Sequence, residues 1–354
     1  KGNGTSNSFD TDTWFAGVSW AVNDEIRLRV NQSTALRAPN VFDLYVGINT
    51  GLVDLSTGEN GLFDPCASAP GVAPSASAAA CARTGATAAQ YASGIEDNPA
   101  GQYNLITGGN PNLVAETGET TTFGVVYTPN WLEGLSVAVD WFDIEVTDAI
   151  GSIPAQASLD GCIAGGSGSG TFCSLIQRDT AGTLWLSNDA PGGGLAGISQ
   201  QNANITSLTT EGVDINVAYS IEAGDWGSFN LDYAGTILDT LDTVPFAGAN
   251  AIKCVDFYAG QCGLPNPEYT HRILGNWITP VNGLSVAATW RFVGETTLYG
   301  LDKAAASARE EQMNDYLEER DYLDISLRYA VTDNITVRAG VNNAFAEDAP
   351  LSTN

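Results

Sequence analysis

Apolar and polar residues alternate along many short segments of the chain, and this period of two predicts β-strands. In GVDINVAYSI, the apolar residues Val213, Ile215 and Val217 alternate with Asp214 and Asn216. Successive side chains of a strand point to opposite faces, so each segment has one apolar and one polar face. We expect about ten such strands, at residues 12–22, 25–36, 117–128, 134–149, 204–220, 227–239, 268–279, 283–295, 320–331 and 335–345.

The connections between the expected strands alternate between short and long. Tight joins are followed by long loops near 37–116, 150–203, 240–267 and 296–319. A soluble β-sandwich also has two-faced strands, but its connections are short at both ends. Short turns on one side and long loops on the other are typical of a transmembrane barrel. The sequence therefore predicts an all-β fold, a transmembrane antiparallel β-barrel.

The segment GNPNLVAETGETTTFGVVYTP, at 109–129, begins polar and ends as an alternating apolar strand. We expect Gly118–Thr122 to lie above the membrane, and Phe123, Val125 and Tyr127 to face lipid. Aromatic residues near strand ends are typical of the interfacial girdles of membrane barrels. Such residues are Trp14, Trp20, Tyr127, Trp141, Tyr219, Tyr233, Trp277, Trp290 and Tyr329.

Six cysteines occur as three local pairs, each inside a long loop. The pairs are Cys66 with Cys81, Cys162 with Cys173, and Cys254 with Cys262. The single histidine, His271, lies in an expected strand outside every cysteine loop. The spacing therefore favours three disulfides over a metal site. Disulfides in turn imply an oxidising compartment. The Ala- and Ser-rich stretch at 69–80 is typical of a flexible spacer within the first of these loops.

The charge and composition exclude several classes of function. A net charge of −27 disfavours binding to nucleic acid. One histidine allows no Ser/His/Asp set that we can assemble, and no Gly-rich phosphate loop follows a buried strand. No apolar run approaches the roughly 20 residues of a membrane helix. We expect no enzyme, no cofactor and no metal ion.

Several stretches resemble, in order, the second half of the barrel of TonB-dependent outer-membrane receptors. STALRAPNVFDLY at 33–45 is similar to a family segment with Arg-x-Pro-Asn. GNPNLVAETGETTTFGVVY resembles the Gly-Asn-Pro-x-Leu-x-x-Glu stretch of the family, which leads into a strand. Three further stretches resemble later strands of the family. They are LSVAVDWFDIEVTDAIGSI at 135–153, TTEGVDINVAYSI, and VRAGVNNAFAEDAP at 337–350.

The resemblance implies about ten strands of an expected 22-stranded barrel, with the plug domain absent from this chain. It implies a receptor in the bacterial outer membrane that binds a scarce nutrient, a siderophore, cofactor or oligosaccharide. Import would use energy from the inner-membrane TonB complex, contacted through a plug. The domain would be a partial receptor barrel, residues 1–354. Its partners would be that complex, outer-membrane lipid and the ligand.

Two groups of residues are candidates for a role at the loop end. Arg37 and Glu116 fit buttresses at the rim of the barrel, or solvated loop charges. Aromatic residues of the expected loops can stack on a sugar or an aromatic siderophore, or stabilise the loops themselves. They are Tyr45, Tyr103, Trp185, Tyr258 and Tyr299. The alternatives to a receptor are a passive porin or surface adhesin of the same barrel class, and a secreted β-sandwich.

Overall fold

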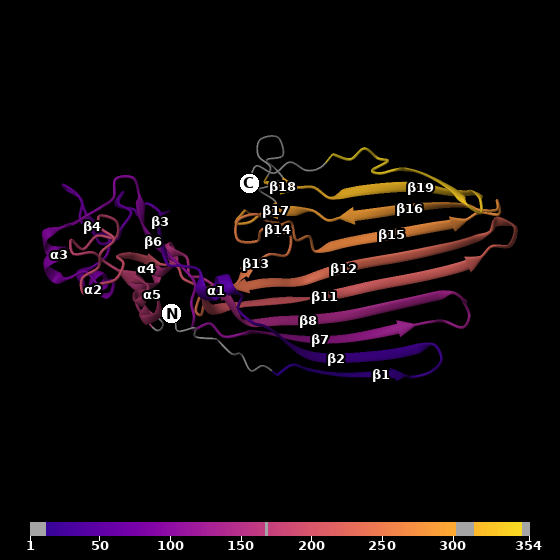
Figure 1. The fold of residues 1–354 in the computed structure, drawn as a ribbon, viewed down its shortest axis with the longest axis horizontal. Coiled ribbons are helices and arrows are strands. Elements are labelled where there is room, and N and C mark those ends of the chain that lie inside the picture. The colour runs from indigo at the N-terminus through magenta and orange to yellow at the C-terminus, as the bar shows by residue number, and fades with distance from the viewer. Residues whose placement is uncertain (1–11, 167–168, 302–314, 349–354) are drawn as a thin grey trace.

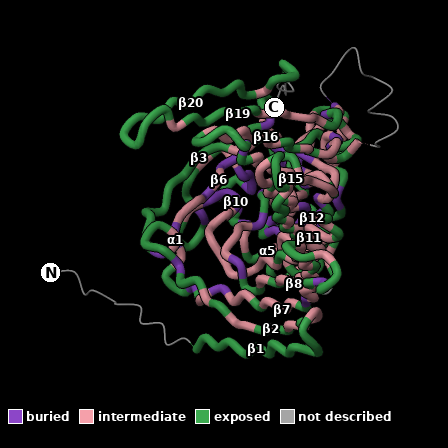
Figure 2. Tube along the Cα trace, turned by 90° about the vertical axis from the view of Figure 1, so that its right-hand side faces the viewer, coloured by how far each residue is buried: buried purple, intermediate pink, exposed green. Residues whose placement is uncertain are grey.

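The computed structural model describes residues 12–166, 169–301 and 315–348. Its main element is an antiparallel sheet in which ten strands follow one another in chain order. Viewed from the strand ends, these strands trace an arc (Figure 2). The predicted antiparallel barrel fold is confirmed. Residues 302–314, in the expected loop at 296–319, lie outside the described residues.

All ten strands of the main sheet occur where the alternation predicts them. The largest difference is at the end of β12, which continues to Val244 instead of ending at 239. The strands are β1 (Trp14–Ala21), β2 (Ile26–Arg37), β7 (Glu116–Tyr127), β8 (Leu135–Gly151), β11 (Ala203–Glu222), β12 (Ser228–Val244), β15 (Tyr269–Ile278), β16 (Leu284–Val293), β19 (Arg320–Thr332) and β20 (Ile335–Val341).

Short and long connections lie at opposite ends of the main sheet (Figure 1). Three of the tight turns place a glycine directly before the next strand: Gly134, Gly227 and Gly283 have φ angles of 85°, 82° and 77°. This left-handed conformation is readily available only to glycine, so these residues fix where each following strand begins. We call the opposite end of the sheet, where the long connections begin, the rim.

One face of the sheet is apolar over the half farther from the rim. Residues paired directly across strands share a face, and Phe123, Trp141 and Val213 form one such row. The next row towards the rim is polar, with Thr121, Asp143 and Glu211. The change from polar to apolar that the sequence predicts within residues 118–127 therefore occurs at the same level on adjacent strands.

Aromatic side chains gather near this level, as expected for an interfacial girdle. Nε1 of Trp141 donates a hydrogen bond to Oε1 of Glu211 (2.8 Å), and the hydroxyls of Tyr233 and Tyr269 are 2.9 Å apart. His271 lies among these rings and stacks on Phe292 at a centroid distance of 5.3 Å. The single histidine is thus part of the aromatic cluster.

Beyond the rim, two long connections combine into one folded unit, the lobe, residues 49–107 and 155–199 (Figure 1). Its sheet has the order β3-β6-β10-β9, so strands from both connections pair. The pairing of β6 with β10 is parallel, through Leu105 and Ile198. The elements of the lobe are β3 (Asn49–Asp54), β4 (Ala67–Ser68), α2 (Ala78–Arg83), α3 (Ala88–Ser93), β5 (Ile95–Glu96), β6 (Gln102–Thr107), α4 (Ala155–Ala164), α5 (Ser169–Ser174), β9 (Ile176–Gln177) and β10 (Gly197–Ser199).

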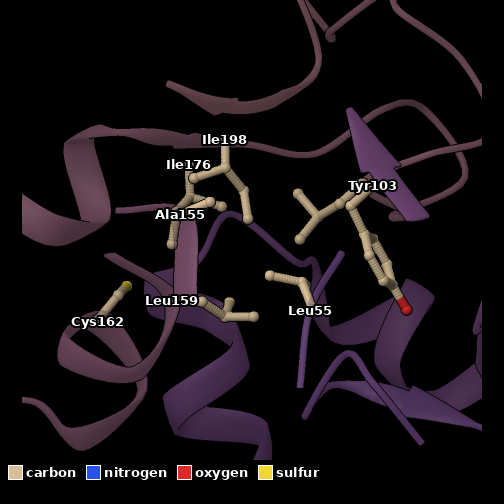
Figure 3. Packing of buried hydrophobic residues seen from close by; sticks show 8 residues of the cluster. Leu55, Tyr103, Ala155, Leu159, Cys162, Ile176 and Ile198 are labelled. Atoms are coloured by element: carbon tan, nitrogen blue, oxygen red, sulfur yellow. The ribbon is translucent and has the colours of Figure 1, made fainter. Parts of the chain in front are cut away.

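The lobe has a hydrophobic core to which both connections contribute (Figure 3). The first supplies Leu55 and Tyr103, and the second supplies Leu159, Ile176 and Ile198. Burial of these side chains stabilises the lobe by roughly 1.5–3 kcal/mol each. Neither connection has this core alone, so the two segments depend on each other for their fold.

The six cysteines form three disulfides in the pairing expected from the sequence. Two of them, Cys66–Cys81 and Cys162–Cys173, lie in the lobe. The expectation of a flexible spacer at 69–80 is wrong at its end, where α2 begins at Ala78. The side chain of Ser77 accepts a hydrogen bond from the Ala80 N–H, and this cap stabilises the start of the helix.

The third disulfide, Cys254–Cys262, belongs to a smaller folded region at the rim. A three-stranded sheet of order β14-β17-β18 forms there. Its strands are β14 (Phe257–Tyr258), β17 (Thr296–Leu298) and β18 (Tyr316–Leu317), and β13 (Ile252–Lys253) pairs with β12.

A short 3₁₀-helix, Gly224–Trp226, closes one tight turn. Among the described helices, none is long and apolar enough to cross a membrane.

Candidate ligand-binding rim

A bidentate ion pair joins three strands at the rim. The guanidinium of Arg37, at the end of β2, donates two hydrogen bonds to the carboxylate of Glu116, at the start of β7. The same carboxylate accepts the N–H of Ile150 in β8, at 2.7 Å. Glu116 is buried, and this rim position lies above the apolar half of the sheet. The hydrogen bonds from Arg37 lower the pKa of Glu116, and the bond from Ile150 acts in the same direction.

Directly after this pair, the chain forms the short helix α1 (Val41–Tyr45), which a capping box begins. The side chain of Asn40 accepts the N–H groups of Phe42 and Asp43, and Asp43 accepts the N–H of Asn40 in return. These bonds satisfy donors that a helix start leaves unpaired. The Asn and acidic residue of the family-like segment at 33–45 are therefore structural.

The segment at 109–116 holds α1 in place from the other side. The N–H of Asn110 donates to the carbonyl of Asp43 at 2.8 Å, and the N–H of Gly109 to that of Val46 at 3.0 Å. A Cβ on Gly109 would lie 2.7 Å from the backbone of Leu44, so only glycine fits. Two segments that the sequence singled out separately thus meet in one structure.

The supported helix and the residues directly after it expose large apolar side chains, which we call the α1 patch: Val41, Phe42, Tyr45, Val46 and Ile48. Phe42 is 76% exposed and Tyr45 is 46% exposed. Large apolar residues grouped on a rigid support are typical of a binding surface. Of the five aromatic candidates from the sequence, Tyr45 is the one on this patch.

Tyr103 and Trp185, two further candidates, contribute to the lobe. Tyr103 is fully buried in the lobe core, and its hydroxyl donates to Asp97. Burial raises the pKa of Tyr103 well above its ordinary value, and the bond to Asp97 adds to this effect. Trp185 packs against the same core, and its Nε1 donates to the carbonyl of Glu96 at 3.1 Å. Tyr103 therefore stabilises the lobe, the alternative role expected for loop aromatics.

Tyr258 and Tyr299 lie in the smaller rim region, away from the lobe core. Tyr258 is buried in β14, and burial raises its pKa. The ring of Tyr299 packs edge-on against Phe257, with centroids 5.9 Å apart. The five aromatic candidates are thus distributed over the α1 patch, the lobe and this region, and they do not form one site.

A buried ion pair that sequence reasoning missed fixes the interior of the lobe. Arg178 donates to both carboxylate oxygens of Asp64, at 2.6 and 3.0 Å, and both side chains are 1% exposed. Arg178 also donates to the hydroxyl of Thr84 and the carbonyl of Gly182. Because the two charged residues lie in different connections, the sequence gives no spacing signal for the pair.

A cavity of about 500 Å³ lies where the lobe meets the rim. Phe172 of α5 and Phe246, after β12, contact each other edge-on at 5.3 Å and line it. Thr171, Thr206 and Ser207 also line this cavity. A volume of this size suits a small molecule. Among the described residues, no group of three or more His, Cys, Asp and Glu side chains is placed to hold a metal ion.

The two-faced strands, the single arc of antiparallel pairing and the turns and loops at opposite ends define a transmembrane β-barrel. Residues 1–344 match the family described as TonB dependent receptor-like, beta-barrel. The chain belongs to this family, which is one of receptors, and this is indirect support for the expectation of no enzyme activity.

Solved structures with a similar fold include two receptors. The ferric enterobactin receptor PfeA of Pseudomonas aeruginosa, as the R480A mutant with enterobactin, is 15% identical, with a TM-score of 0.54. The match covers 94% of this chain and 35% of that one. The siderophore receptor PirA of Acinetobacter baumannii is 15% identical, with a TM-score of 0.54, and 97% and 38% are covered. The chain thus spans little more than a third of either. A comparison with curated proteins found no significant match.

Proposed function

We propose that this barrel is part of a receptor that binds a scarce nutrient at its rim and imports it with energy from the TonB complex. The observation that carries the proposal is the lobe. Two long connections form a unit with its own core, two disulfides and a buried ion pair. A passive pore does not need a folded unit of this size at its mouth, whereas a receptor needs a rigid surface that holds its ligand.

The outer membrane of a bacterium is the location that fits this proposal. The face of the main sheet that is apolar over the half farther from the rim would contact lipid there. The rim and the lobe would face the cell exterior. Three disulfides agree with an oxidising environment. On this proposal, residues 1–354 are a partial barrel domain, and a plug elsewhere in the protein contacts TonB. The test of location is fractionation of cells, in which the receptor should require detergent for extraction.

The α1 patch and the cavity beneath the lobe are the surfaces we propose for ligand binding. The patch offers Phe42 and Tyr45 for stacking, and the cavity offers Phe172 and Phe246 with nearby hydroxyls. The solved relatives are named as receptors for siderophores or for ferric enterobactin. They favour a siderophore among the candidate ligands, over a cofactor or an oligosaccharide.

Uptake and binding by the full-length receptor test this function. Loss of the inner-membrane TonB partner should abolish accumulation of labelled ferric siderophore and leave surface binding nearly unchanged. Deletion of residues 245–267, which removes Phe246 but spares β12, should weaken binding itself. Uptake that survives loss of TonB and follows the external concentration would favour the passive porin. Surface attachment without any uptake would favour the adhesin.

Substitutions at the patch separate binding from folding. Phe42→Ala and Tyr45→Ala should each weaken ligand binding, because a stacking contact contributes about 0.5–1.5 kcal/mol beyond buried area. Trp131→Ala is the matched control: Trp131 is 74% exposed and lies in a tight turn at the opposite end of the sheet. Equal losses in the three variants would contradict a binding role for the patch.

A further inference from the structure

Positive charge in the main sheet is confined to one face. The basic residues of the ten strands are all arginines. The cross-strand register places all of them on the polar face. They are Arg27, Arg29, Arg37, Arg272, Arg291, Arg320, Arg328 and Arg338. The chain as a whole has a net charge of −27. This face is therefore positive in places, in a protein that is otherwise strongly acidic.

Half of these arginines have a carboxylate partner. The ion pairs are Arg29 with Asp140, Arg37 with Glu116, Arg291 with Asp324, and Arg320 with Glu318 and Glu347. Within the described part of the chain, no ion pair involves Arg328 or Arg338. Asp333, in the turn between β19 and β20, forms none with either.

Arg328 and Arg338 are directly opposite each other in the register of β19 and β20. Their side chains therefore leave the sheet on the same face, at neighbouring positions. Like charges directly opposite each other destabilise a strand pair. On its other side, Arg328 faces Ser285 of β16, which supplies a hydroxyl and no negative charge. Among the described residues, neither guanidinium group thus has a carboxylate partner.

A hollow of about 390 Å³ is lined by both arginines and by Asn276, Ser285 and Ser326. These neutral side chains offer an amide and two hydroxyls as hydrogen-bond donors. A guanidinium group donates in a planar fork that matches a carboxylate or a phosphate. We propose that this hollow is an oxyanion-binding site, in which Arg328 and Arg338 bind one carboxylate or phosphate group between them.

The oxyanion has two possible sources with the same chemistry. It is either an acidic solute that enters from the lumen, or a carboxylate side chain of a protein segment that packs against the polar face. Both sources neutralise the opposed arginines. The inference depends neither on TonB nor on uptake, so it can fail while the proposed function stands, and the reverse.

Binding of inorganic pyrophosphate to the full-length receptor in detergent tests the first source. Titration calorimetry at low salt is suitable, because salt screens such contacts. Arg328→Gln and Arg338→Gln should each weaken binding about tenfold or more, since each removes a charge-assisted hydrogen bond. Arg27→Gln is the control: it lies on the same face opposite Ala21 and Val126, without a second arginine. Binding that persists in both site variants, or that Arg27→Gln weakens equally, overturns the proposal.

If the native receptor does not bind pyrophosphate, thermal unfolding tests the second source, a protein carboxylate. If a protein carboxylate already fills the site, each single substitution should lower the unfolding temperature, and the double variant should lower it no further than the worse single variant. If the single substitutions raise the unfolding temperature or leave it unchanged, the arginines merely repel each other. That result, without pyrophosphate binding, overturns the proposal.

Discussion

Arg29 reaches Asp140 across the strand that separates them, and Gly124 of that strand makes the contact possible. The guanidinium in β2 and the carboxylate in β8 form two hydrogen bonds, one of them 2.6 Å from Nε to Oδ1. Gly124 lies between them in β7, and a Cβ there would overlap the Asp140 carboxylate. The missing side chain of Gly124 thus links three strands on the polar face.

Gly124→Ala should therefore destabilise the barrel although alanine suits a strand better than glycine. We expect a cost of about 1–3 kcal/mol, from a displaced ion pair and an overpacked contact. Urea unfolding of the folded barrel measures it. The control is Gly275→Ala in β15, where the added Cβ meets nothing within 4 Å. Equal stability of the two variants would contradict a requirement for glycine at position 124.

Adjacent positions of β11 should respond differently to a charge. Ile215 lies on the apolar face, and Asn216 on the polar face, where it borders the same hollow as Asp214. If this stretch lies near the bilayer midplane, Ile215→Arg should cost about 2–4 kcal/mol and Asn216→Arg much less. Unfolding from lipid bilayers measures both. Similar costs would contradict our assignment of the faces.

Glu116→Gln should destabilise the rim by about 1–3 kcal/mol, because the buried site loses a charged acceptor. The folded pKa of Glu116 lies below its unfolded value. Its stabilisation is therefore complete above the unfolded pKa, about 4.3, and is lost as the pH falls through the folded pKa. The difference between native protein and variant should vanish in acid. Glu119→Gln, at an exposed position of the same strand, should show little effect at any pH.

Removal of the Cys66–Cys81 disulfide should loosen the lobe and spare the barrel. A closed loop of this size, with a separation of 15 residues, stabilises the fold by about 3 kcal/mol in the chain-entropy model. Limited proteolysis of a Cys66→Ser/Cys81→Ser variant should therefore cut within residues 49–107 sooner than in the native protein. Removal of Cys254–Cys262, outside the lobe, should leave this cleavage rate unchanged. If both variants are cut alike, the disulfide does not act locally.

The barrel strands were predictable because their signal is local. Alternation such as that of Val213, Asp214 and Ile215 is visible within a few residues, and membrane strands must obey it along their whole embedded length. The end of β12 was less predictable. The pairing register of β11 with β12 changes at a β-bulge between Glu211 and Gly212. Strand β12 continues beyond this bulge and pairs with β13. The extra residue of a bulge shifts the alternation by one, so the period of two breaks there although the strand continues.

The lobe was not predictable from the same signals. Its strands are short, and its core joins residues from two connections, as Leu55 and Leu159 show. Tyr103 illustrates the difficulty, since an aromatic residue in a loop shows by itself neither burial nor exposure. The rim was intermediate: the sequence singled out Arg37 and Glu116, but the structure was needed to show their bidentate pairing and the role of Ile150.

The parallel pairing of β6 with β10 also constrains how this protein can change over evolutionary time. Each of the two connections contributes strands and core residues that the other completes. A recombination event that exchanges one connection alone would leave an exposed half-core and an unpaired strand edge, which invites aggregation. The two connections should therefore be inherited together. Engineering a new specificity by grafting would likewise require both segments from one donor.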